Sequence, residues 1–159
     1  MWFSHNDLIH KKSIIVDDLH GYILPHAGTK YTGYILSHTL QFKPKKVFNK
    51  IIIIYYPAHT KPNIYNKYYH EYYVVWKTLE YVIKHFWNIK TNITYVGYNI
   101  RDNNIINSTN NINYTSHDSL IVISADFSHF LPLQKALHLE NCAAHSIMHR
   151  IFHTKCTNI

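Results

Sequence analysis

The segment Val47 to Tyr56 constrains the fold more than any other part of the chain. It is β-branched and aromatic, and the longest uninterrupted aliphatic run, Ile51 to Ile54, lies inside it. Its apolar residues do not alternate with polar ones, which is typical of a strand buried on both faces. Such strands belong to parallel sheets whose faces are covered by helices. Pro57 is expected to end this strand.

The rest of the chain alternates between strand-like and helix-like patterns. Short apolar segments predict strands at 21–24, 93–96 and 120–124, and longer segments predict helices at 32–42, 71–87 and 137–152. Pro44 is expected to end the first helix, and the Asn-rich residues 99–116 are expected to form a polar loop. This order predicts an α/β fold: a single domain over residues 1–159, with a largely parallel sheet flanked by helices.

Composition limits the protein class. The 159 residues are 47% hydrophobic, which suffices for one domain with its own core. No segment approaches the roughly 20 apolar residues of a membrane helix, and the first residues lack the pattern of a secretory signal. Two cysteines, Cys142 and Cys156, are too few for a disulfide framework. We therefore expect a soluble, intracellular protein of the cytoplasm that does not associate with a membrane.

The chain is basic, with 16 Lys and Arg against 9 Asp and Glu and a net charge of +7. The positive residues are scattered, and the densest cluster is only Lys43 to Lys46. A solvated basic surface is therefore favoured over a nucleic-acid site, so we do not expect nucleic acid as a partner. A protein or peptide partner and the oligomeric state are left open.

Three of the 14 histidines each follow a predicted strand. His26 comes after residues 21–24, His59 after Val47 to Tyr56, and His129 after 120–124. Ligands of open α/β sheets bind beyond the carboxyl ends of the strands, where loops from different strands converge. Neutral imidazoles suit iron, copper and zinc, and three protein ligands leave one position open for chemistry. The alternative is that these are solvated loop histidines, because a chain with so many histidines places some after strands by chance.

Other groups could complete such a site. Asp126 could orient an imidazole or act as a base, and Gly28 would allow close approach of the backbone. A base or a fourth ligand could also come from residues that no spacing places near the three histidines, namely Glu71, His70, His117, Cys142 and Cys156.

Three segments carry a resemblance to a known family. They are Leu-Pro-His-Ala-Gly-Thr-Lys-Tyr-Thr-Gly at 24–33, the strand and loop at 51–59, and Ser-Ala-Asp-Phe-Ser-His at 124–129. They resemble Pro-His-Ala-Gly-Tyr-x-Tyr-x-Gly, Gly-Pro-x-His and Ser-Ser-Asp-Phe-(Ser/Cys)-His of the Memo family, named for a mediator of cell motility. That family is related in fold to class III extradiol dioxygenases. Departures from its pattern occur at Thr29, Tyr56 and Ala125.

The resemblance spans about residues 20–150 and implies a site. It assigns His26, His59 and His129 as metal ligands, with copper or iron as the ion. It matches Glu71 to the Glu of the family's Glu-His-Ser segment, although Tyr72 and Tyr73 replace the His and Ser. The expected pocket residues beside the ligands are Asp126, Glu71, Gly28 and Tyr31.

Two functions follow from the resemblance. The chain is shorter than members of the family, so segments that wall their pocket are missing. We therefore expect a three-histidine pocket that binds a metal ion or a peptide without catalysis. The alternative is a metal-dependent oxidoreductase of the extradiol dioxygenase type, with Asp126 as its candidate acid or base.

Overall fold

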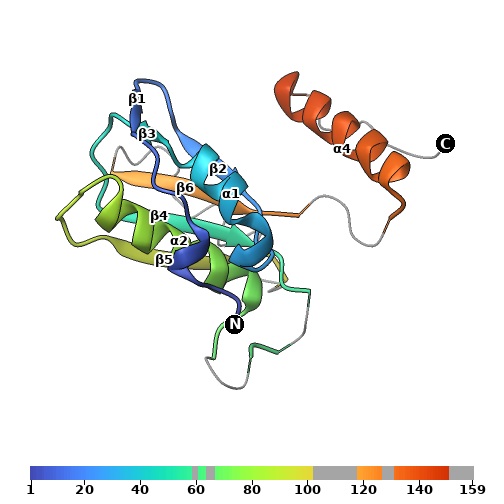
Figure 1. The fold of residues 1–159 in the computed structure, drawn as a ribbon, viewed down its shortest axis with the longest axis horizontal. Coiled ribbons are helices and arrows are strands. Elements are labelled where there is room, and N and C mark those ends of the chain that lie inside the picture. The colour runs from blue at the N-terminus through green and yellow to red at the C-terminus, as the bar shows by residue number, and fades with distance from the viewer. Residues whose placement is uncertain (59–60, 64–66, 102–117, 127–130, 151–159) are drawn as a thin grey trace. The chain divides into compact units, whose positions relative to one another are not determined.

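The computed structural model describes residues 1–58, 61–63, 67–101, 118–126 and 131–150 (Figure 1). The chain forms two compact units, Met1–Ala125 and Asp126–Ile159. The described part of the second unit consists mainly of helix α4 (Leu133–Met148), none of whose residues is buried. All the strands that the structure describes belong to the first unit.

The first unit is built on a four-stranded sheet in the order β2-β6-β4-β5. The strands are β2 (Gly21–Leu24), β4 (Lys50–Tyr55), β5 (Thr94–Asn99) and β6 (Ser119–Ser124). Every neighbouring pair in this sheet is parallel. The predicted α/β class with a parallel sheet is therefore confirmed, and β4 has the burial expected of a central strand, since Ile51 and Ile53 are completely buried.

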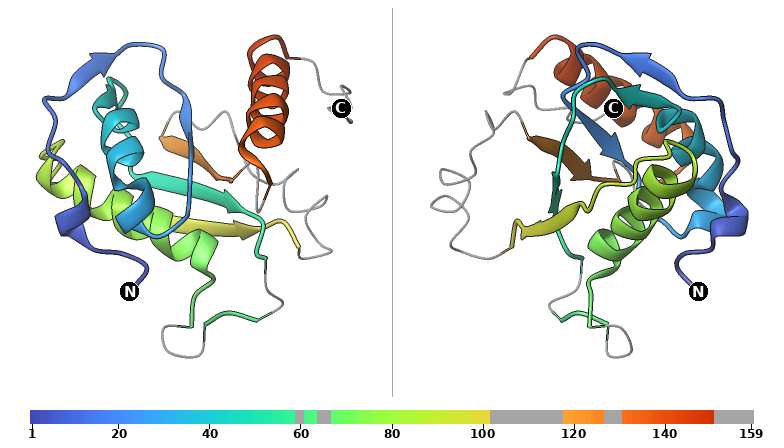
Figure 2. Two further views of the ribbon diagram at one scale, coloured as in Figure 1. Left: turned by 45° about the vertical axis from the view of Figure 1, so that its right-hand side comes forward. Right: turned by 90° about the vertical axis from the view of Figure 1, so that its left-hand side faces the viewer.

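Two helices, α1 (Thr29–Thr39) and α2 (His70–His85), cover one face of this sheet (Figure 2). The chain moves in the same direction across the sheet from β2 to β4 and from β4 to β5. Because parallel crossovers are right-handed, two moves in one direction put both helices on the same face. Their apolar residues share one core with that face of the strands, formed by Tyr22, Leu24, Leu36, Leu40, Ile51, Ile53, Val75, Leu79, Val82, Leu120 and Val122.

The predicted end of the first helix is wrong. Helix α1 ends at Thr39, and Phe42–Pro44 forms strand β3 instead of a last helical turn. The reason is tertiary pairing, since β3 lies parallel to β1 (Ile14–Val16) in a separate two-stranded sheet. Tyr22 ties this small sheet to the main one by donating a hydrogen bond to the carbonyl oxygen of Phe42.

The other predicted elements are present with shifted bounds. Helix 71–87 is α2, helix 137–152 corresponds to α4, and strand 93–96 is β5, which is longer because it pairs with β4 along its whole length. Residues 102–117, most of the predicted polar loop, lie outside the described residues.

The N-terminal segment packs against the first helix through small residues. Gly33 and Ser37 lie one turn apart on α1 and face the 3-10 helix η1 (His5–Asp7) and the residues after it. A Cβ atom on Gly33 would overlap the carbonyl oxygen of Asp7. The hydroxyl of Ser37 accepts a hydrogen bond of 2.9 Å from the amide of Ile9. This packing holds the first residues of the chain beside the start of α1.

None of the helices within the described residues combines the length and the apolar character that crossing a membrane requires.

Candidate functional site

The candidate site lies at the carboxyl edge of the sheet, as the positions of the histidines predicted. Leu24 pairs with Ser124, and Ser124 pairs with Tyr55, so β2, β6 and β4 end at the same level. His26 follows β2 by two residues and is half-buried there. Loops that leave neighbouring parallel strands at one level converge, and such edges are where α/β folds bind ligands.

A short chain of contacts connects His26 to the start of α2. Nδ1 of His26 lies 3.0 Å from Oγ of Ser124, the last residue of β6. The same hydroxyl donates a hydrogen bond of 2.6 Å to the main-chain carbonyl oxygen of Glu71. Ser124 is 5% exposed and Glu71 is 4% exposed, so these contacts are shielded from water.

This arrangement determines the tautomer of His26. A serine hydroxyl has a single hydrogen, and that of Ser124 is used in the bond to the Glu71 carbonyl. Towards His26, the Ser124 oxygen can therefore only accept, so Nδ1 of His26 carries the hydrogen and donates it. In the neutral ring, Nε2 then carries the lone pair, which makes Nε2 the atom suited to bind a metal ion or a proton.

The same arrangement makes Ser124 unsuitable as a nucleophile. An activated serine donates its hydrogen to the base that will remove it. Ser124 donates to a main-chain carbonyl instead. Its role in the structure is to position His26.

The carboxyl group of Glu71 connects a third strand to the site. Its Oε1 accepts a hydrogen bond of 2.8 Å from the main-chain amide of Ala58, in the loop that follows β4. Glu71 thus receives a bond from the end of β6 through its carbonyl and a bond from the β4 loop through its carboxyl group. The loops that follow β2, β4 and β6 are in this way joined at the first turn of α2.

A second imidazole lies next to His26. The ring of His70, the first residue of α2, has its centroid 6.0 Å from that of His26, and the two planes are nearly perpendicular at 88°. His70 also makes an edge contact with the indole of Trp2, at 4.6 Å and 81°. The main-chain carbonyl oxygen of Trp2 accepts a hydrogen bond of 3.0 Å from the amide of Thr29, which holds the backbone of Trp2 at the start of α1.

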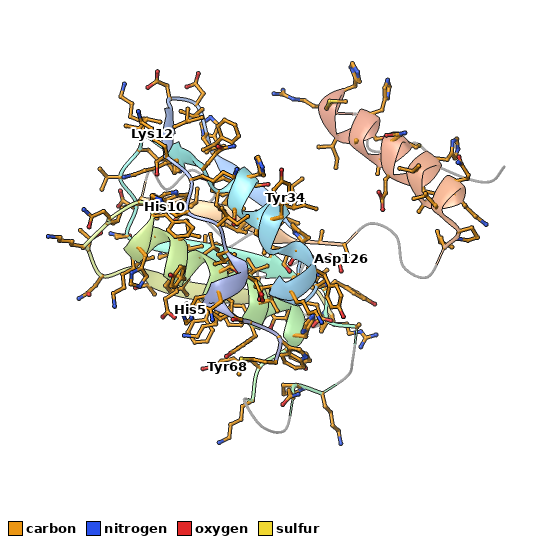
Figure 3. The ribbon with its side chains drawn as sticks, in the orientation of Figure 1. His5, His10, Lys12, Tyr34, Tyr68 and Asp126 are labelled. Carbon is orange, nitrogen blue, oxygen red and sulfur yellow. The ribbon has the colours of Figure 1, made fainter. Side chains whose placement is uncertain are left out.

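Of the residues predicted for the site, the structure brings His26 and Glu71 together, linked through Ser124. Gly28 directly precedes α1, next to the main chain of Trp2. Tyr31 does not join this group, because its side chain on α1 is 77% exposed. Asp126 follows β6 and opens the second compact unit (Figure 3).

The two other predicted ligands, His59 and His129, lie outside the described residues. Within the described residues, no three His, Cys, Asp or Glu side chains form a group that could hold a metal ion. The three-histidine site therefore stays a prediction. Cys142, a further candidate ligand, is disulfide-bonded in the structure, so its sulfur is not available as a thiolate in this state.

Two residues of the site could not be placed beside His26 from the sequence, although Ser124 opens the third motif and His70 is among the candidates for a fourth ligand. Ser124 is the last residue of an apolar strand, and its contact with His26 depends on the pairing of β2 with β6. His70 is separated from His26 by a helix and a strand, and only the packing of α2 brings the two rings together. The sequence signals for Ser124 are its place at the end of a predicted strand and at the start of the third motif.

Neither a protein-family model, nor a curated protein, nor a solved structure matches this chain. The resemblance to the Memo family therefore remains an expectation from three motifs.

Proposed function

We propose that the protein binds a metal ion, iron or copper, at the carboxyl edge of its sheet, with His26, His59 and His129 as ligands. The observation that carries the proposal is the contact between His26 and Ser124, which leaves the lone pair of the neutral ring on Nε2. Histidine ligands of metals typically donate their other ring hydrogen to a fixed acceptor, which sets both tautomer and orientation. His26 fits this requirement.

The anchoring of the β4 loop supports the second ligand. Ala58 immediately precedes His59, and its amide is bonded to the carboxyl group of Glu71. Glu71 is in turn bonded to Ser124, which contacts His26. A main chain tied this close to the site is suited to present the next side chain to the same ion.

We propose binding without turnover. A dioxygenase needs an acid or base placed beside the bound substrate. The hydroxyl of Ser124 is committed to the carbonyl of Glu71, and Oε1 of Glu71 is committed to the amide of Ala58. Both groups therefore support the loops. Asp126 is left as the candidate acid or base of the competing function, the oxidoreductase.

Metal analysis of the purified protein tests this proposal. We expect one equivalent of iron or copper after loading, and at least a tenfold loss of affinity in His26→Ala. His20→Ala serves as the control, because His20 is exposed and precedes β2 at the other end of the strand. Equal metal content in His26→Ala and the unmodified protein would refute the site. Oxygen uptake with a catechol by iron-loaded protein would instead favour the oxidoreductase.

A further inference from the structure

We propose that the outer face of α1 is a docking surface for an acidic amphipathic helix of a partner protein. The inference goes beyond the proposed metal site and does not depend on it. It starts from large apolar side chains that the fold leaves exposed, namely Tyr31, Tyr34 and Ile35 on α1 and Ile9 just after η1. We call these four residues the α1 surface.

The helical repeat puts the exposed and the buried residues of α1 on opposite sides. Tyr31, Tyr34 and Ile35 follow the spacing i, i+3 and i+4, which makes them neighbours on one side of a helix. Tyr34, labelled on α1 in Figure 3, is 61% exposed, and Ile35 is 54% exposed. The buried residues of the helix are Thr29, Thr32, Gly33, Leu36 and Ser37. The exposed residues take no part in the core, and apolar side chains gathered at a surface are typical of a protein interaction site.

The packing of the N-terminal segment holds Ile9 beside α1. The amide of Ile9 donates a hydrogen bond of 2.9 Å to the hydroxyl of Ser37, and Gly33 lets η1 lie directly against the helix. Asp7 adds a further link, since its carboxyl group accepts a hydrogen bond of 2.7 Å from the hydroxyl of Thr29. The backbone under the α1 surface is therefore fixed before a partner binds. Binding to an ordered surface costs less conformational entropy, so the contacts contribute more to affinity.

Lysine side chains border the α1 surface. Nζ of Lys11 lies 5.8 Å from the ring centroid of Tyr34, and Nζ of Lys30 lies 5.9 Å from that of Tyr31. The sequence has no Asp or Glu in α1 or in residues 8–13. The surface thus combines apolar side chains with positive charge. Its complement is a segment whose apolar side chains are flanked by carboxylates.

The same contacts favour a protein partner over single-stranded nucleic acid. Proteins bind unpaired bases by stacking them on aromatic rings. The rings of Tyr31 and Tyr34 each already have a lysine ammonium over them. A base would displace this ammonium, whereas a carboxylate can pair with it while the contact with the ring persists. Ile9 and Ile35 offer a base neither a stacking plane nor a hydrogen bond, but they can pack against apolar side chains.

The α1 surface suits a helix of another protein better than a second copy of this chain. Side chains spaced i, i+3 and i+4 form ridges that fit the grooves of a second helix. In a two-fold dimer the same surface would meet itself. Lys11 and Lys30 of both copies would then border one interface, and like charges there oppose association.

Peptide selection on the full chain tests the α1 surface. Random peptides of about 16 residues, enough for about four helical turns, are displayed on phage and selected on the unmodified protein. The recovered peptides are synthesised and titrated by fluorescence anisotropy. We expect them to be rich in Asp, Glu and large apolar residues, and to bind Tyr34→Ala and Ile35→Ala at least tenfold more weakly. Val47→Ala is the matched control, because Val47 is exposed between β3 and β4 and should not contribute.

The charge requirement has its own variants. The double variant Lys11→Gln/Lys30→Gln should bind the recovered peptides at least threefold more weakly than the unmodified protein. Binding to the unmodified protein should also weaken as the salt concentration rises, because salt screens exposed charges. Lys90→Gln is the control, since Lys90 is exposed between α2 and β5, and it should bind as the unmodified protein does.

Several outcomes would overturn the proposal. The first is that no recovered peptide is acidic, or that the peptides bind Tyr34→Ala and Ile35→Ala as tightly as the unmodified protein. The second is a pool of random single-stranded RNA, or vesicles containing phosphatidylserine, that requires Tyr34 for binding when no acidic peptide does. The third is a dimer in sedimentation equilibrium that Ile35→Asp dissociates. Circular dichroism of each variant verifies that it is folded, as expected for substitutions of exposed side chains.

Discussion

Ser124 holds two parts of the site together through one hydroxyl group. Replacing it with alanine leaves the Nδ1 hydrogen of His26 and the carbonyl of Glu71 without this partner in a buried place. We expect Ser124→Ala to lower the free energy of unfolding by about 1–3 kcal/mol, the usual cost of leaving buried polar groups unsatisfied. Urea denaturation followed by circular dichroism measures this. Ser124→Ala should also weaken metal binding, because the ring of His26 loses its fixed orientation.

Ser146→Ala provides the comparison for Ser124→Ala. Ser146 lies on α4, and its hydroxyl makes no hydrogen bond within the described part of the chain. We expect Ser146→Ala to change the free energy of unfolding by no more than about 0.5 kcal/mol, as for most substitutions away from specific contacts. Equal effects of the two substitutions would show that the Ser124 hydroxyl is not a structural link.

The residue scale also separates what local sequence can and cannot predict. His26 could be placed at the carboxyl edge because it directly follows a short apolar strand, which is a local pattern. The contact of Ser124 with His26 is not local, since 98 residues separate them. It depends on the register of β2 with β6, in which Leu24 pairs with Ser124. His70 likewise depends on where α2 packs, which no spacing reveals.

At the scale of elements, the close approach of η1 to α1 depends on Gly33. Alanine is the better helix former by about 1 kcal/mol, so a helix alone would gain from Gly33→Ala. Here a Cβ atom would meet the main chain of Asp7, which cannot move without displacing η1. We therefore expect Gly33→Ala to lower the free energy of unfolding by about 1–3 kcal/mol, as for other overpacked contacts. Thermal or urea unfolding measures this loss.

Gly28→Ala is the matched control for this clash. Its nearest neighbour, the carbonyl oxygen of Trp2, would be 3.4 Å from the new Cβ atom, which is ordinary contact. The φ angle of Gly28 is −51°, which alanine also adopts. We expect Gly28→Ala to change the free energy of unfolding by less than about 1 kcal/mol. A Gly33→Ala variant as stable as Gly28→Ala would contradict the close packing of η1 on α1.

The elements that the sequence pattern missed are those that pair with distant segments. The strands β1 and β3 have three residues each and form their own small sheet, so neither shows the long apolar run that identified β4. The periodic pattern of α1 extends into Phe42, but pairing with Ile14 draws that residue into a strand. Helix α2 was predicted nearly to its ends because its apolar spacing is local and continuous, with Val75, Leu79 and Val82 all buried.

At the scale of the whole molecule, one buried tyrosine, Tyr22, and two partly buried ones, Tyr72 and Tyr95, tie stability to alkaline pH. Burial raises the pKa of Tyr72 to about 12, with smaller contributions from Tyr68 and Glu80. Burial also raises the pKa values of Tyr22 and Tyr95 above their usual range. In the unfolded chain all three phenols ionise near pH 10. Between pH 10 and 12 the unfolded state therefore binds fewer protons than the folded state, and linkage requires stability to fall as the pH rises.

The Tyr72→Phe variant tests this linkage, because it removes one of the three phenols and keeps its ring. We expect the unmodified protein to lose stability progressively between pH 10 and pH 12, and Tyr72→Phe to lose less over the same range. Urea denaturation at pH 8, 10, 11 and 12 measures the loss, with each protein's value at pH 8 as its own reference. Absorbance of tyrosinate at alkaline pH should show one late-ionising phenol fewer in the variant. Parallel losses of stability in the two proteins would mean that Tyr72 ionises alike in the folded and unfolded chains. The partial burial of Tyr72 argues against this outcome, since its ring on α2 has its centroid 5.6 Å from that of Tyr55 on β4 and 5.7 Å from that of Trp76.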